Sequence, residues 1–130
     1  MEREVVIVNN FCTVLKDFLT DMYKSYPDNS LLLLKNMTDA MIFSNPRGVV
    51  KNYMLCVKSY QRKILAKDED FFLNGELEND LSSGEYSFLL DELKKICNIW
   101  RDSNTSLNTK NAIWKYLQVL INLGNKLSLT

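Results

Sequence analysis

The chain has 130 residues, and its 16 Lys and Arg residues balance 16 Asp and Glu residues, so that its formal net charge is zero. This balance argues against a protein built mainly to coat nucleic acid or an anionic membrane. A hydrophobic fraction of 46% with only four Gly and two Pro residues excludes a disordered or low-complexity chain. The length predicts a single folded domain over residues 1–130.

Residues 5–26 are predicted to form the first helix. Apolar residues recur there at alternating spacings of three and four, at Val8, Phe11, Leu15, Phe18 and Met22. This is the period of a helix that buries one face. The helix is expected to end at Pro27, because proline disfavours helical geometry in the residue before it.

A second helix is predicted over residues 29–43, with Asp28 as its N-cap. Its core face carries five residues: Leu31, Leu34, Met37, Thr38 and Met41. Leu32 and Phe43 point away from that face, beside polar neighbours. Apolar side chains left outside a core are candidates for contact with a partner. Leu32 and Phe43 are therefore the first two candidate binding residues.

A third helix is predicted from residue 46 to about residue 67, because Asn45-Pro46 reads as an N-cap followed by proline at the first helical position. Its inward face is expected to carry Val50, Tyr53, Val57, Tyr60 and Ile64. Four bases form a stripe on the opposite side: Arg47, Lys51, Lys58 and Arg62. On a regular helix these four lie within about 60° of one another.

The basic stripe has two interpretations. It is either a solvated face, partly neutralised by the acidic segment that follows it, or a docking strip for phosphate or for an acidic surface. We favour the solvated face, because four exposed bases are ordinary for a helix and the whole chain is neutral.

Residues 68–84 are the least regular part of the chain and are predicted to form an acidic connecting loop, with a helical turn near Phe71 and Phe72. Their acids do not follow the spacing of a calcium-binding loop, so a solvated loop is the better interpretation. The pattern Ser82-x-x-Glu85 resembles a capping box and predicts a fourth helix over about 83–101.

The last helix, within residues 111–124, has an unusually wide apolar face. Its polar residues Asn111, Lys115, Gln118 and Asn122 fall on one narrow strip, and apolar residues cover well over half of the circumference. Such a helix fits the centre of a compact all-α bundle of about five helices.

Within this last helix, Ile113, Leu117 and Leu120 are expected to be fully buried against the first helix. Gly124 suits its C-terminal cap. Trp114 and Val119 lie at opposite edges of the apolar arc, so at least one of them is expected to be partly exposed. That edge is a candidate contact with a protein partner.

The sequence contains no histidine, which removes the commonest general base and the commonest metal ligand. Cys12, Cys56 and Cys97 are widely spaced within helical apolar patterns, so we expect reduced core thiols. There is no phosphate-binding glycine loop and no dinucleotide fingerprint. We therefore expect no enzyme activity, no cofactor, no metal site and no small-molecule substrate.

The N-terminus lacks the basic and then apolar pattern of a signal peptide. The longest purely apolar run, Leu31 to Leu34, is far too short to span a bilayer. We therefore expect a cytoplasmic protein with no membrane partner.

Two segments carry a resemblance to known proteins: FCTVLKDFLTDMYKSYPDN at residues 11–29 and IWKYLQVL at residues 113–120. In these segments the chain resembles small helical proteins of unknown function in nucleocytoplasmic large DNA viruses. Those proteins pair an N-terminal helix that ends in an aromatic-Pro step with a distant Trp-Lys-Tyr-Leu helix. The resemblance implies a virus-encoded protein in the host cytoplasm or the virion, and it carries no catalytic residues across.

Two functional hypotheses follow. In the first, the protein is a structural or interaction module that binds another protein, or a second copy of itself, through apolar surface. In the second, it is a nucleic-acid-associated factor that uses the basic stripe. Salt separates them, because phosphate contacts weaken steeply as salt rises whereas apolar association is little weakened.

Overall fold

The computed structural model describes residues 2–80 and 84–127. Within these residues the secondary structure consists of helices and their connections, and there is no strand. The helices are α1 (Glu2–Ser25), α2 (Asn29–Ser44), α3 (Pro46–Val57), α4 (Gln61–Leu65), α5 (Asp70–Leu73), α6 (Ser87–Arg101) and α7 (Leu107–Gly124). Two 3₁₀ turns, η1 (Lys58–Tyr60) and η2 (Glu76–Asn79), interrupt the series. The predicted all-α architecture is confirmed, with α1, α2, α3, α6 and α7 as the long helices.

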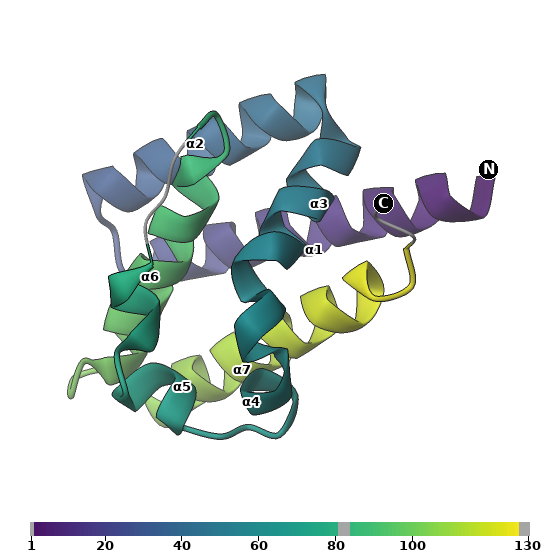
Figure 1. Ribbon diagram of the computed structural model, residues 1–130. Coiled ribbons are helices and arrows are strands. Elements are labelled where there is room, and N and C mark those ends of the chain that lie inside the picture. Colours follow the sequence, from purple (N-terminus) through teal and green to yellow (C-terminus); the bar gives the residue numbers. More distant parts are fainter. Residues whose placement is uncertain (1, 81–83, 128–130) are drawn as a thin grey trace.

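Helix α7 lies at the centre of the bundle. It contacts α1, α3, α4 and α6, and its longest contact is with α1. Figure 1 shows α1 and α7 side by side and running in opposite directions, with α3 and α6 crossing them and α2 packed outside. The predicted central position of the last helix is confirmed.

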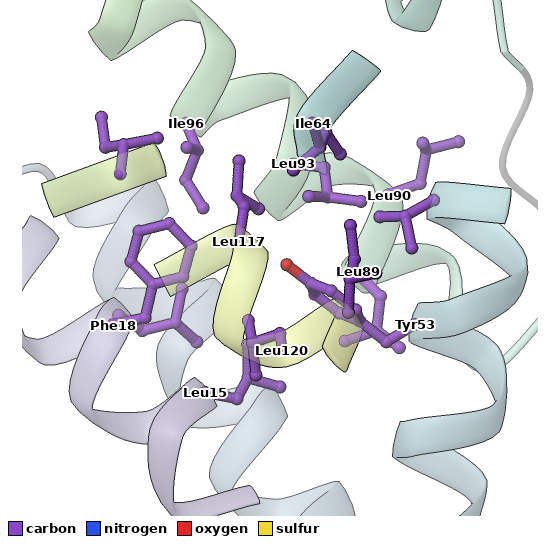
Figure 2. Close-up of a cluster of buried hydrophobic side chains, with 14 of the residues drawn as sticks. Leu15, Phe18, Tyr53, Ile64, Leu89, Leu90, Leu93, Ile96, Leu117 and Leu120 are labelled. Atoms are coloured by element: carbon purple, nitrogen blue, oxygen red, sulfur yellow. The ribbon is translucent and has the colours of Figure 1, made fainter. Parts of the chain in front are cut away.

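The core centres on the inward face of α7. Ile113, Leu117 and Leu120 are all fully buried, as predicted. Figure 2 shows Leu117 beside Phe18 and Leu120 beside Leu15, so both α7 residues pack against α1. Burying a side chain of this size stabilises a fold by about 1.5–3 kcal/mol, so this contact contributes a large share of the stability.

The polar strip of α7 differs in part from the prediction. Asn111, Lys115 and Asn122 are exposed, but Gln118 is half-buried. Its Nε2 donates to the backbone oxygen of Ile64 at 3.1 Å, which satisfies a carbonyl at the C-terminal end of α4. A polar residue expected to face water instead joins two helices.

Gly124 does not cap α7, contrary to the prediction. It is the last residue of the helix, and it lies against Met54, whose side chain a Cβ at this position would overlap. The described glycines with positive φ are Gly75 and Gly84. Gly124 is therefore needed for close approach of α3 rather than for a left-handed cap.

The predicted helix starts at Asp28 and Asn45 are confirmed. Asp28 Oδ1 accepts from the backbone N–H of Ser30 at 2.7 Å, and Asn45 Oδ1 accepts from that of Gly48 at 3.0 Å. Pro46 occupies the first turn of α3. The predicted capping residue Ser82 lies outside the described residues, and α6 begins at Ser87, later than predicted.

The single helix predicted from 46 to 67 is wrong: η1 divides it into α3 and α4. The interruption contains no proline or glycine, so no sequence signal marks it. The 3₁₀ turn redirects the chain so that Tyr60 packs on Phe71, with ring centroids 5.4 Å apart, and Ile64 enters the core beside α7. Tertiary packing, rather than local propensity, sets this break.

The acidic loop is anchored by three buried side chains. The helical turn predicted at Phe71 and Phe72 is α5, and both rings are buried, as is Leu77 of η2. On its outer side, Asp70 and Glu76 pair with Lys63 at 2.6 and 3.9 Å. The loop is thus acidic toward solvent and apolar toward the core.

Replacing Leu117 by Ala is expected to lower the free energy of unfolding by about 2–5 kcal/mol, because it leaves a cavity at the most enclosed part of the bundle. Asn122→Ala, at an exposed position of the same helix, is the matched control and should change stability by less than about 0.5 kcal/mol. Urea denaturation of both variants checks this. Equal, small effects would show that α7 is not central.

Candidate interaction surfaces

The cysteines are poorly suited to nucleophilic chemistry. All three are reduced thiols; Cys12 and Cys97 are buried, and Cys56 is half-buried. Burial raises the pKa of Cys12 to about 11, against a smaller opposing effect of Lys16, and burial also raises the pKa of Cys56. A thiol needs a lowered pKa to act as a nucleophile near neutral pH.

Glu92 is an acidic residue buried in the core, and it was not identified from the sequence. It lies on α6 with 1% of its surface exposed and touches Thr38 of α2 through a short hydrogen bond to Oε2. Its other oxygen, Oε1, has no hydrogen-bond partner among the described residues, and neither does the hydroxyl of Tyr53. The sequence signal was an acid at helical spacing between Leu89 and Ile96, on the apolar face.

Burial raises the pKa of Glu92 to about 8; the Thr38 hydrogen bond opposes this, and the charges of Asp39 and Asp91 add to it. The Thr38 hydroxyl also contacts the Leu34 carbonyl oxygen at 3.0 Å. The Thr38 hydroxyl donates to Glu92 Oε2 and also lies within hydrogen-bond distance of the Leu34 carbonyl oxygen, so its single proton is shared between two acceptors.

Glu92 therefore joins α6 to α2 through Thr38, and burial favours the neutral form of its carboxyl. A perturbed pKa can mark a catalytic site, but this carboxyl is enclosed on all sides and no substrate can reach it. Its role in the folded protein is structural.

Trp114 belongs to a buried aromatic cluster. It is 4% exposed and packs edge-on against Trp100, with ring centroids 6.2 Å apart. Phe72 stacks on Trp100 at 4.4 Å and meets Trp114 at 4.7 Å. Of the two edge residues of the α7 arc, Trp114 is thus a core residue and offers no surface to a partner.

Val119 lies at the other edge and is partly exposed, as predicted for one of the two residues. It lines a surface hollow of about 400 Å³ between α1 and α7, here called the α1–α7 groove. The groove is formed by Val14, Asp21, Ala112, Lys115, Tyr116 and Val119. Its lining is mainly apolar, with Val14, Ala112, Val119 and the ring of Tyr116 between the charged residues Asp21 and Lys115.

The two walls of the α1–α7 groove carry opposite charges. On α1, Asp21 accepts a short hydrogen bond from the hydroxyl of Tyr116. The pKa of Tyr116 rises to about 12 through partial burial, this hydrogen bond and the charges of Asp21 and Asp17, which places Asp17 nearby. On α7, Lys115 is exposed and forms no salt bridge within the described residues.

The outer face of α2 holds the other two candidates. Phe43 is 93% exposed, whereas Leu32 is half-buried. Leu33 and Met37 are also exposed, about 80° or more around the helix from Phe43. The apolar side chains of α2 therefore point in different directions, and Met37 borders a smaller hollow of about 260 Å³.

The basic residues do not form the straight stripe that was predicted. Arg47 and Lys51 lie on α3, Lys58 is the first residue of η1, and Arg62 lies on α4. Three residues of 3₁₀ geometry rotate the following turn by about 60° relative to an α-helix, so Arg62 leaves the row. Arg47 also pairs with Glu4 at 3.8 Å.

Lys51 and Lys58 remain together at one hollow. They border a space of about 230 Å³ with Leu55 and with the end of α7. Neither lysine forms a salt bridge within the part of the chain that the structure describes. Two lysines make a short basic rim, not an extended track for a phosphate backbone.

No protein-family model, curated protein or solved structure matches this chain. Among residues 2–80 and 84–127, no cluster of acidic or cysteine side chains could hold a metal ion. No described helix is long and apolar enough to cross a membrane.

The stability of the protein is expected to fall as pH rises from 4.5 to 8, the two pKa values of Glu92 in the unfolded and folded chain. In this interval the folded state holds one more proton, so the slope is at most about 1.4 kcal/mol per pH unit. Glu92→Gln should remove this slope, as measured by urea denaturation across the interval.

The exposed residue Glu85 supplies the control, and Glu85→Gln should retain the wild-type slope. An identical pH dependence in wild type and Glu92→Gln would mean that Glu92 is ionised in the folded protein.

Proposed function

We propose that the protein is a non-enzymatic interaction module that binds a protein through the α1–α7 groove. The observation that carries this proposal is the groove itself: Val14, Ala112 and Val119 form an apolar surface on the two helices that anchor the core. An apolar hollow on a rigid base is the form of site that anchors partner side chains.

The chemistry of the chain supports a binding role over catalysis. The sequence has no histidine, the pKa of Cys12 is raised by burial, and the Glu92 carboxyl is enclosed. These features leave the usual acid–base and nucleophilic roles without a suitable group.

The location and origin of the protein belong to the same proposal. The resemblance of residues 11–29 and 113–120 to small helical proteins of nucleocytoplasmic large DNA viruses supports a virus-encoded protein. We propose the host cytoplasm or the virion as its place, and a virion or host protein as its partner.

A nucleic-acid-associated function is the second candidate. It is supported by Lys51, Lys58 and Arg62, which are exposed and form no salt bridge within the described residues. The break at η1 and the short basic rim favour the protein-binding proposal over it. RNA binding that falls steeply with salt and is lost on reversing Lys51 and Lys58 would favour this candidate.

The groove is tested by Val119→Asp, which places a charge among apolar side chains. Tagged and untagged copies are expressed together in the producing cells, and all proteins bound to the tagged copy are quantified by mass spectrometry. We expect at least a tenfold loss of bound protein, because an unpaired charge in an interface costs more than about 1.4 kcal/mol.

Two further variants make this experiment specific. Ala112→Glu fills the groove from its other end and should have the same effect. The Lys51→Glu, Lys58→Glu double variant alters the distant basic rim and should bind normally. Thermal midpoints within a few degrees of wild type exclude unfolding as the cause. Unchanged binding by both groove variants would overturn the proposal.

A further inference from the structure

We infer that the occupant of the α1–α7 groove is a second copy of this chain, related to the first by a two-fold axis that runs along the groove. The inference deepens the proposed function and rests on it. It is carried by the charges on the groove walls, which are acidic on α1 and basic on α7 at the same level of the groove.

The antiparallel packing of α1 and α7 fixes these levels. The rings of Phe18 and Tyr116 stack with centroids 4.7 Å apart, and Tyr116 donates to Asp21. Asp21 therefore lies at the level of residue 116, next to Lys115. Asp17 is one turn from Asp21 on the same helix. The two acids on α1 and Lys115 on α7 therefore face outward side by side.

A two-fold axis along the groove preserves these levels and exchanges the walls. It places α1 of each copy over α7 of the other, in antiparallel orientation, as in a four-helix bundle. Asp17 and Asp21 of one copy then face Lys115 of the other, and the same contact forms a second time by symmetry. Val14 and Val119 meet at the centre.

The alternative two-fold axis, across the groove, lacks this match. It places α1 over α1 and α7 over α7, with the direction of the groove reversed. Lys115 then faces the same helix of the other copy rather than an acidic wall. Charge complementarity therefore selects the axis along the groove.

The first measurement is the mass of the purified full chain by sedimentation equilibrium over a hundredfold range of concentration. We expect a mass that rises toward twice the chain mass of 15.1 kDa. A monomer at every concentration would overturn the inference. The proposed function would survive that result if the groove variants still lost a different bound protein in the cellular experiment.

Charge reversal tests the geometry. Lys115→Asp places acid against acid, and the Asp17→Lys, Asp21→Lys double variant places base against base. Each variant alone should dimerise at least tenfold more weakly than wild type, because like charges across an interface repel. An equal mixture of the two reversed chains should restore wild-type affinity as a heterodimer, because both contacts again pair opposite charges.

The controls separate this arrangement from other causes. Glu85→Gln removes one charge at an exposed residue outside the groove and should leave dimerisation within threefold of wild type. The Lys51→Glu, Lys58→Glu double variant changes charge elsewhere and should dimerise normally. If the mixture of reversed chains stays as monomeric as its components, the two-fold axis does not run along the groove and the inference fails.

Discussion

Burial of α7 against α1 is the contact on which the rest of the fold depends. Leu117 and Leu120 are enclosed by residues from helices far apart in the sequence, and the other contacts of α7 reach α3, α4 and α6. Packing at this density leaves little room for rearrangement. The same helix pair also forms the groove, so the proposed binding surface lies on the two helices that make the most extensive contact in the bundle.

Polar and aromatic contacts join the outer elements to this centre. Tyr26, after α1, donates to Thr105 at 2.5 Å, and Thr105 donates to the Ile99 carbonyl oxygen at 2.5 Å, so the loop before α7 is fixed to α6. Lys95 of α6 pairs with Asp28 at 2.8 Å. Phe72 brings the acidic loop into contact with both tryptophans. These contacts orient the helices, while apolar burial supplies most of the free energy.

Sequence periodicity predicted the long helices and their buried faces, because spacings of three and four report directly which side of a helix avoids water. It could not predict the break at η1, since no proline or glycine marks it and the redirection depends on Phe71, a residue of another element. It could not assign Gln118 either, because the carbonyl that this side chain satisfies belongs to α4. The spacing of residues within one helix gives no information on the contacts of that helix with other elements.

The binding surface was predictable only in part, for the same reason. The wide apolar arc identified Trp114 and Val119 as its edges, but the choice between them depends on Phe72, which covers Trp114 from a loop distant in sequence. The α1 wall of the groove could not be found from α7 alone. The burial of Glu92, by contrast, was predictable, since an acid on the apolar face of a helix indicates a buried polar group.

Native-state hydrogen exchange tests the central position of α7 most directly. We expect the amides of residues 117–121 to exchange only through global unfolding, with an opening free energy equal to that from urea denaturation, whereas amides of the outer helix α2 exchange through smaller openings. Exchange of the α7 amides by local opening, with slower exchange in α2, would contradict it.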